Sequence, residues 1–287
     1  MSDKPTATNG EYFTVPGWSV VSLRGEDASR FAQAQFMGDV AALAPGHWQW
    51  NGWLTPKGRV IALFALLKLD ESTLFLLLAD AEPAGFATAL SRFVFRSKVR
   101  VAHETDLHVS GAFRAPADAS GARFARPSDA TLELDLGAEG GARTLRIDAE
   151  ATADDPEAAS RWQAFDLAHG LPRLDPAQSE QWTPQQLSLE RLRAFSVKKG
   201  CYPGQEIVAR THFLGQAKRG LVRLAGTSAL AAGDVSAAGA VDRSIGQVVS
   251  RADNEALAVM PLDAGEGSFE VAGVVCTPRP LLGGLAR

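Results

Sequence analysis

The sequence predicts a soluble α+β protein of three compact units, the last of which is a small β-barrel. The chain has 287 residues, and a single core stops growing at roughly 250–300 residues, so more than one unit is expected. Apolar residues follow helical spacing in some segments and form strand-like runs in others. We place the N-terminal α+β region in two units, residues 1–113 and 114–214, which can be discontinuous in sequence. The barrel occupies residues 215–287.

The overall composition is that of a globular protein, because 46% of the residues are hydrophobic and 22% are charged. The net charge of −4 argues against a general nucleic-acid coat, so we expect no direct nucleic-acid partner. The N-terminal residues lack the apolar core of a secretory signal. Two cysteines, Cys201 and Cys276, exclude a disulfide scaffold and suit a reducing compartment. These features predict a cytoplasmic protein.

The first elements can be assigned in order along the N-terminal region. Apolar residues in 26–36 share one helical face, and a glycine follows as a stop signal. Residues 60–79 are the most apolar run of the chain, but charged residues interrupt it, and each half is too short to span a bilayer. We therefore expect two buried strands joined by a turn at residues 70–72, and no association with a membrane.

The next elements alternate between helical and strand-like patterns. Residues 82–98 have the i, i+4, i+7, i+8 apolar spacing of a helix, with a proline in its first turn. The alternation in residues 101–109 is typical of a strand, and residues 131–136 and 143–149 are short strand candidates. The segment 161–174 is expected to begin as a helix that ends near residues 170–172. A second is expected over 183–195, where a threonine can cap the helix and a proline follows.

The last part of the chain is β-rich. Four short segments, LVRL, SIGQVVS, ALAVM and FEVAGVVC, follow Gly215 and are separated by glycine, aspartate or asparagine. Short strands with turn residues between them are typical of a small all-β barrel. We therefore expect a barrel of about 70 residues at this end.

The stretch KKGCYPGQEIVAR, residues 198–210, carries most of the chemistry. A Pro-Gly turn precedes a helix that can start at Gln205, and Glu206 would lie in its first turn, where negative charge is favoured. Cys201 would lie just before this helix, close to backbone N–H groups and to lysine and arginine side chains. Such surroundings lower the pKa of a thiol and favour a reactive thiolate. The alternative is a small buried residue that only packs.

The motif K-G-C-Y-x-G-Q-E, followed by an Ala-Arg pair, resembles the signature of the YgfZ-type folate-binding proteins. These are relatives of the tetrahydrofolate-dependent aminomethyltransferase, or T-protein, of the glycine cleavage system. Further stretches match in the same order: FAQAQFMGDV at 31–40, with Ala34 where glycine is usual, PKGR at 56–59 and GQAKRGL at 215–221. The resemblance spans roughly residues 25–260.

This resemblance implies a three-domain cloverleaf around a central channel that binds folate. It also implies a role in assembling or maintaining iron–sulfur clusters, and a connection to tRNA modification. In the T-protein a carboxylate follows a Gly-Gly turn that corresponds to Lys57-Gly58, whereas residues 59–64 contain no acid. Because proton transfer at the folate needs such a group, the lack of an acid at these positions argues against aminomethyl transfer. Asp39 and Glu206 are the acids that could replace it.

A folate site needs apolar or aromatic walls, a few polar groups and cations for the tail carboxylates. Tyr202 and Trp50 could form walls, although Trp48 and Trp50 alternate as on a strand, which favours the core for one of them. The cations would be Arg59, Lys199 and Arg210. The predicted site contains Cys201 as the thiol, and Lys199, Tyr202, Gln205, Glu206, Arg210, Asp39, Lys57, Arg59 and Trp50 as the residues that bind tetrahydrofolate or a derivative.

Metal binding has weaker support in the sequence. A stable iron–sulfur cluster usually needs four cysteines, and this chain has two. His103 and His108 are five residues apart, not the four that place two ligands on one helical face. His169 is interpreted as a helix-end residue that the helix dipole favours.

The sequence thus predicts a folate-binding accessory protein that uses Cys201 to support iron–sulfur client enzymes or their assembly factors. One alternative is a folate-dependent one-carbon transferase with a relocated acid. The other is a structural adaptor in which the cysteine only packs.

Overall fold

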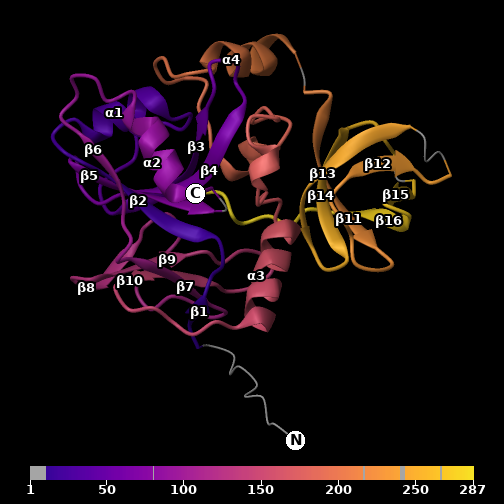
Figure 1. Ribbon diagram of the computed structural model, residues 1–287, viewed down its shortest axis with the longest axis horizontal. Helices are drawn as coiled ribbons and strands as arrows, with labels where there is room; N and C mark the ends of the chain where they lie inside the picture. The colour runs from indigo at the N-terminus through magenta and orange to yellow at the C-terminus, as the bar shows by residue number, and fades with distance from the viewer. Residues whose placement is uncertain (1–10, 80, 216, 240–242, 266) are drawn as a thin grey trace, which may run out of the picture.

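The computed structural model describes residues 11–79, 81–215, 217–239, 243–265 and 267–287. It has three lobes: two five-stranded antiparallel sheets and a closed six-stranded barrel. In Figure 1 the two sheets lie one above the other on the left and the barrel lies on the right, with the C-terminus between the lobes. This arrangement confirms the predicted α+β fold with a C-terminal barrel. Every helix among the described residues is too short or too polar to cross a lipid bilayer.

The first sheet has the strand order β3-β4-β5-β2-β6. Its strands are β2 (Trp18–Arg24), β3 (His47–Leu54), β4 (Val60–Lys68), β5 (Thr73–Ala79) and β6 (Arg100–His103), and the helices α1 (Ala28–Gln35) and α2 (Pro83–Ser91) belong to the same lobe. The predicted hairpin over 60–79 is present as β4 and β5. Both faces of this hairpin are buried, which explains why its sequence is nearly continuous in apolar residues.

Helix α2 begins where the sequence predicts and ends earlier. The carboxylate of Glu82 accepts hydrogen bonds from the N–H groups of Ala84 and Gly85, so it caps the helix, and Pro83 occupies the first turn. The prediction that the helix continues to residue 98 is wrong. Phe95 has a φ of +43°, in the left-handed region that interrupts a right-handed helix.

The second sheet has the order β1-β7-β10-β9-β8. It consists of β1 (Phe13–Thr14), β7 (His108–Ala112), β8 (Ala125–Ser128), β9 (Thr131–Asp135) and β10 (Thr144–Asp148). The last two are the strands predicted over 131–136 and 143–149. The expectation of one strand over 101–109 is wrong, because the chain turns between β6 and β7 and passes from the first sheet to the second.

The two later helices differ from their predictions. Helix α3 (Pro156–Ala168) begins five residues before the predicted start, since Asp155 accepts hydrogen bonds from the N–H groups of Glu157 and Ala158. The α-helix predicted over 183–195 is absent. That segment forms turns and one short 3-10 helix, η2 (Leu189–Leu192). The residues on either side of η2, Ser188 and Arg193, are left-handed, so no α-helical ladder can pass through them.

The barrel closes in the order β11-β14-β13-β12-β15-β16. Its strands are β11 (Arg219–Gly226), β12 (Asp234–Ala237), β13 (Ser244–Ala252), β14 (Glu255–Pro261), β15 (Phe269–Val271) and β16 (Val274–Arg279). Three of the four segments that the sequence singled out lie in these strands, and FEVAGVVC covers β15, a turn and the start of β16. The strand that the sequence missed is β12. Closure leaves the barrel without a free sheet edge.

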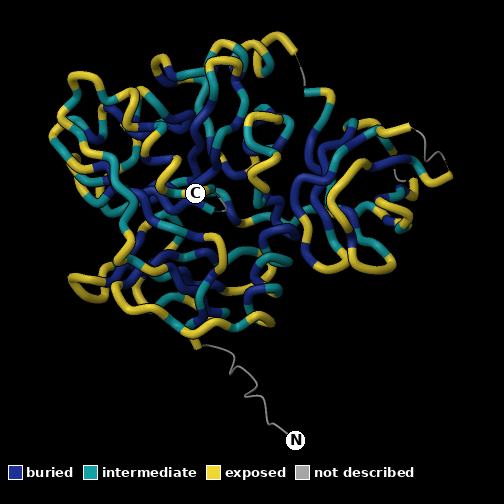
Figure 2. The backbone as a smooth tube through the Cα atoms, viewed as in Figure 1, coloured by how far each residue is buried: buried dark blue, intermediate teal, exposed yellow. Residues whose placement is uncertain are grey.

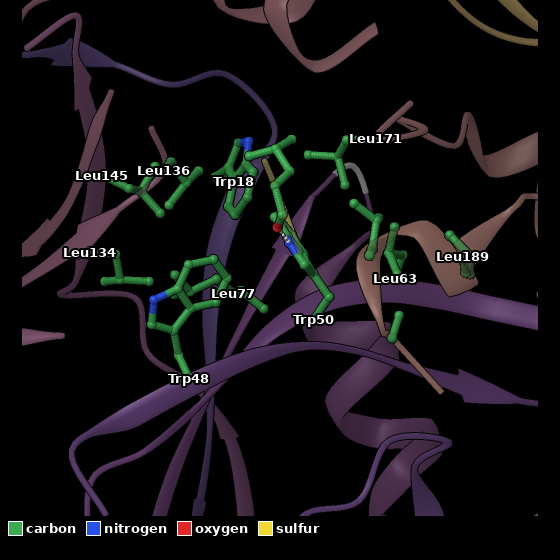
Figure 3. Packing of buried hydrophobic residues seen from close by; sticks show 14 of the residues in the cluster. Trp18, Trp48, Trp50, Leu63, Leu77, Leu134, Leu136, Leu145, Leu171 and Leu189 are labelled. Carbon is green, nitrogen blue, oxygen red and sulfur yellow. Dashed lines mark hydrogen bonds between the residues drawn. The ribbon is translucent and has the colours of Figure 1, made fainter. Parts of the chain in front are cut away.

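One hydrophobic core connects the lobes. Figure 3 shows Trp18, Trp48 and Trp50 of the first sheet opposite leucines of the second, and the same cluster includes residues of the barrel. The rings of Trp48 and Trp50 meet edge to face, with centroids 5.4 Å apart. Figure 2 shows buried backbone where the barrel meets the rest of the molecule. Trp48 and Trp50 on β3 are therefore both core residues.

The segment after β16 returns to this core. Leu285 is 2% exposed, and its carbonyl accepts a hydrogen bond of 2.7 Å from the indole N–H of Trp50. The N–H of Leu282 donates to the carbonyl of Ala168 in α3. Arg287 donates to backbone carbonyls of the second lobe. These contacts tie the chain beyond the barrel to both sheets.

Replacing Leu285 with alanine should lower the free energy of unfolding by about 2–4 kcal/mol, since it removes a buried side chain and leaves a cavity. Leu262, which is 64% exposed, is the matched control, and Leu262→Ala should change stability by less than about 0.5 kcal/mol. Urea unfolding followed by circular dichroism measures both. Equal effects of the two substitutions would contradict the assignment of Leu285 to the core.

Candidate functional site

The motif at 198–210 forms a loop and the start of helix α4 (Gln205–Leu214), next to the turn between β3 and β4 (Figure 1). The helix begins at Gln205, as predicted, and Glu206 lies in its first turn. Gly204 is the N-cap residue, with a φ of +80° that a side chain would strain. The loop therefore has a fixed geometry, set by a glycine at the entry to the helix.

Lys199 anchors this loop to the first lobe. Its side chain is buried, and its ammonium donates to the carbonyls of Gln33, Phe36 and Gly38, at 2.5, 2.7 and 3.0 Å. These carbonyls lie at the end of α1 and just beyond it, where backbone acceptors have no partner within the helix. Burial lowers the pKa of Lys199 to about 8, partly offset by Asp39. The group is still protonated at neutral pH, with every N–H paired.

Two glycines bring the motif against the β3–β4 turn. A Cβ atom on Gly204 would lie 2.6 Å from the Cα of Gly58 and 2.6 Å from the carbonyl oxygen of Thr55. Gly58 has a φ of +70°, and a Cβ there would lie 3.0 Å from the Cβ of Ile207. Only glycine allows the two backbones to approach this closely. The PKGR turn and the cysteine motif are thus in direct contact.

Three of the segments quoted from the sequence therefore meet at one place. The N–H of Ser196 donates to the carbonyl of Met37, and the hydroxyl of Tyr202 donates to the carbonyl of Ser196 at 3.1 Å. Burial raises the pKa of Tyr202 to about 12, so it stays protonated. The side-chain oxygen of Asn51 accepts from the N–H of Gly38 at 2.7 Å. These bonds fix the loop that carries the cysteine.

The two cysteines have opposite surroundings. Cys201 is exposed, whereas Cys276 is 1% exposed inside the barrel. Burial raises the pKa of the Cys276 thiol, which makes it less reactive. The neighbour of Cys201 in the loop, Lys198, is also exposed. Cys201 is thus the thiol that a partner or reagent can reach.

Several other predicted residues are engaged in local bonds. The side chain of Gln205 donates to the carbonyl of Lys199, and Glu206 forms an exposed ion pair with Arg210. The carboxylate of Asp39 accepts from the side chain of Gln33 at 3.1 Å. These interactions stabilise α4 and the end of α1.

The last three predicted residues lie on β3 and in the turn that follows it. Arg59 donates to the carbonyl of Gln181 at 2.8 Å and to the side chain of Gln186. Lys57 is exposed in the β3–β4 turn, and Trp50 is in the core. The structure gathers most of the predicted residues around the loop.

A cavity of about 300 Å³ lies in the first lobe, between β4, α2 and residues 172–179. Its volume is at the lower end of the range for small-molecule sites. Its walls are mainly apolar, and the rings of Trp53 and Phe86 meet in it edge to face at 5.4 Å. The lining residues are Trp53, Ile61, Ala62, Leu63, Ala79, Ala81, Glu82, Gly85, Phe86, Ala89, Pro172, Leu174, Asp175, Pro176 and Ser179.

None of the ten site residues predicted from the sequence lines this cavity. Its polar groups are the carboxylates of Glu82 and Asp175 and the hydroxyl of Ser179, which donates to the carbonyl of Ile61 at 3.0 Å. The sequence contained one indication of this cavity: the apolar residues after the PKGR turn form its β4 wall. The rest of the lining comes from separate apolar segments that no motif marks.

His169 lies at the end of a helix, as predicted, but not because of a charge on its ring. It is the C-cap of α3, but its ring is buried against Phe165, and burial lowers its pKa. Its Nε2 accepts from the N–H of Gly140, so Nδ1 carries the proton and donates to the carbonyl of Phe165. The ring is neutral, so an interaction between a positive charge and the helix dipole does not hold it at the helix end. Among the described residues, no cluster of three or more histidines, cysteines and acids could hold a metal ion.

The sequence matches curated proteins over most of its length. The tRNA-modifying protein YgfZ of Klebsiella pneumoniae is 30% identical over 237 residues, which cover 75% of this chain and 71% of that protein. The chain belongs to the YgfZ family. The YgfZ protein of Aliivibrio fischeri is 28% identical over 277 residues, covering 87% of this chain and 84% of that protein. No protein-family model matches the sequence.

The fold has a counterpart among solved structures. The glycine cleavage system aminomethyltransferase T from Bartonella henselae superposes with a TM-score of 0.72, covering 96% of this chain and 86% of that one. The sequences are 14% identical, so this likeness concerns the fold. The expected resemblance to the YgfZ family and the T-protein-like architecture are both confirmed.

Replacing Lys199 with alanine should destabilise the protein by about 2–4 kcal/mol, because buried carbonyls lose their donor. The adjacent Lys198 is exposed, so Lys198→Ala should change the free energy of unfolding by less than about 0.5 kcal/mol. Chemical denaturation measures both. Similar stability of the two variants would show that Lys199 is not an anchor.

The folded pKa of about 8 also predicts a pH dependence. Between this value and that of an unfolded lysine, near 10.4, the unfolded chain binds more protons than the folded one. The contribution of Lys199 to the free energy of unfolding therefore rises with pH across this window. The difference in stability between wild type and Lys199→Ala should grow from pH 7 to about pH 9.5. A difference that shrinks would contradict the assigned shift.

Proposed function

We propose that this protein is a folate-binding accessory factor that supports the assembly or repair of iron–sulfur clusters in client enzymes. The cavity between β4 and α2 holds the pterin of tetrahydrofolate or a derivative. Cys201 is the thiol offered to a client enzyme or assembly factor in the cytoplasm. Membership of the YgfZ family supports a folate-related function, and the cavity supports the binding of a pterin ring.

The chemistry of the cavity matches a pterin ring. A pterin has flat apolar faces and N–H donors along one edge, and the cavity offers the rings of Trp53 and Phe86 together with the carboxylates of Glu82 and Asp175. Each oxygen of Glu82 already accepts one backbone N–H in capping α2. A carboxylate oxygen has a second lone pair, so it can accept from a ligand as well. This combination of aromatic wall and acceptors is the observation that carries the proposal.

The β4 wall favours an accessory factor over an aminomethyltransferase. Ile61, Ala62 and Leu63 line the cavity, on the strand where the T-protein resemblance places a carboxylate. The proposed replacements, Asp39 and Glu206, do not line it. An apolar wall cannot take or give a proton. This feature supports binding without aminomethyl transfer, and a turnover assay with methylene-tetrahydrofolate tests it.

The position of Cys201 supports a role toward a partner. An exposed thiol can reach another protein, whereas a packing residue would be buried like Cys276. A single thiolate cannot hold an iron–sulfur cluster alone, because such clusters usually have four cysteine ligands. In this proposal the cluster is cargo, and the partner provides the remaining ligands. The structural adaptor is the alternative that an exposed cysteine supports least.

Calorimetry should detect binding of tetrahydrofolate, and a bulky residue in the cavity should weaken it. Ala89 lines the cavity on α2, whereas Ala84 is exposed on the same helix and does not. We expect Ala89→Trp to lower the affinity about tenfold or more, which corresponds to about 1.4 kcal/mol, and Ala84→Trp to leave it unchanged. No binding by wild type at millimolar ligand would remove the folate assignment.

The role of Cys201 can be tested by complementation. In a strain that lacks the gene, we expect wild type and Cys276→Ala to restore the activity of iron–sulfur enzymes and Cys201→Ser to fail. Immunoblots should show equal amounts of the variants, since Cys201 is exposed and its loss removes little packing. Full restoration by Cys201→Ser would withdraw the role of this thiol.

A further inference from the structure

Helix α4 is attached to the molecule along one face and exposed along the other. Val208 is its buried residue, and the carbonyl of Val208 accepts a hydrogen bond of 2.9 Å from the side chain of Gln185. The residues at the i, i+4, i+7 and i+8 positions of the opposite face are all exposed: Glu206, Arg210, Phe213 and Leu214. Figure 1 shows α4 at the top of the molecule, beyond the tips of β3 and β4. A continuous helical face is therefore open to a partner.

The end of this face is apolar. Phe213 is 66% exposed and Leu214 is 84% exposed (Figure 2). The ring of His212 meets that of Phe213 edge to face, with centroids 4.9 Å apart. Two adjacent large apolar side chains in water gain free energy when they are buried, and clustered exposed apolar surface marks interaction sites. The end of α4 therefore has the character of a contact surface.

This apolar end lies within reach of a partner that meets the thiol. Cys201 is exposed four residues before the first residue of α4. A helix rises about 1.5 Å per residue, so Phe213 lies about 12 Å along the axis from Gln205. A standard interface buries about 800 Å² on each protein. One interface of ordinary size can therefore cover both Cys201 and the end of the helix.

The charge around α4 is opposite to that of the rest of the chain. The whole sequence has 29 lysines and arginines against 33 acids. Residues 190–219 contain seven of these cations and two of the acids, which leaves 22 cations and 31 acids elsewhere. Arg193, Lys198 and Lys218 are exposed and form no ion pair with any residue that the structure describes. Lys198 precedes the helix and Lys218 follows it, so positive charge flanks the exposed face at both ends.

We propose that the exposed face of α4, from Cys201 to Leu214, docks a protein partner that has an apolar pocket for Phe213 and Leu214 and acidic residues around that pocket. The inference rests on the proposed function, because the partner is the client enzyme or assembly factor that meets Cys201. Apolar anchors provide the affinity of such a contact. Opposite charges at its rim raise the rate of association and select the partner.

The same surface is less suited to RNA. Proteins that bind single-stranded RNA stack its bases on flat aromatic rings, and Leu214, the more exposed of the two apolar residues, has no ring. A nucleic acid also carries its phosphates far beyond one helix. Outside residues 190–219 acids outnumber cations, so a long polyanion would meet like charge there. A compact acidic protein surface avoids this repulsion.

Complementation tests the surface independently of the thiol. In a strain that lacks the gene, we expect Phe213→Ser/Leu214→Ser, which keeps Cys201, to fail to restore the activity of iron–sulfur enzymes. The control Phe95→Ser/Val275→Ser removes two exposed apolar side chains from the first lobe and the barrel, and it should restore activity fully. All four residues are exposed, so the thermal unfolding curves and the cellular amounts of both variants should match those of wild type.

Photo-crosslinking identifies the chemistry of the partner. In the same strain, Phe213→p-benzoylphenylalanine should crosslink to a protein, and mass spectrometry should place the link beside apolar residues flanked by acids. Phe95→p-benzoylphenylalanine is the control and should not crosslink to that protein. Replacing those acids with lysine should weaken its binding to wild type about tenfold or more. The variant Lys198→Glu/Lys218→Glu should recover the lost affinity.

The outcomes separate this inference from the proposed function. If Phe213→Ser/Leu214→Ser restored activity fully while Cys201→Ser failed, the docking surface would be overturned and the role of the thiol would remain. Full restoration by both variants would overturn both. A crosslinked product that ribonuclease removes would show an RNA contact, and a partner site without acids would remove the charge complementarity. Either result would overturn the inference.

Discussion

The arrangement of the site depends on one buried ammonium group. Lys199 reaches from the cysteine loop to the end of α1 and satisfies carbonyls that the helix itself cannot pair. A buried charge is costly unless its hydrogen bonds are complete, and here they are. The negative end of a helix dipole is also a favourable place for a cation. This interaction fixes residues 196–204 against the first lobe, although more than 150 residues separate them from α1.

The fixed loop affects both the position of the β3–β4 turn and the exposure of Cys201. The backbone of Gly204 lies against that of Gly58 and so determines where the β3–β4 turn lies. Three residues after Gly58, at Ile61, strand β4 begins to line the cavity. On the other side, the loop leaves Cys201 exposed. The cavity and the loop that carries the thiol are thus connected through the β3–β4 turn, although the thiol does not line the cavity.

The sequence predicted those elements whose signals are local. The β4–β5 hairpin, helix α4 and the barrel follow from apolar runs, turn residues and caps within a few positions. Residues 183–195 have an equally good helical pattern, but Ser188 and Arg193 become left-handed as the leucines between them enter the core. The carbonyls that accept hydrogen bonds from Lys199 come from the end of α1, which no local pattern could reveal. The cavity was not predicted, because its walls are apolar residues from separate segments, which no local pattern connects.

A crystal structure with tetrahydrofolate bound would test the central claim most directly. The account predicts a pterin ring in the cavity between β4 and α2, against Trp53 and Phe86, with Cys201 still open to solvent and Lys199 still bonded to the end of α1. A ligand bound beside Trp50 and Leu285, or stacked on Tyr202 with the loop displaced, would contradict it.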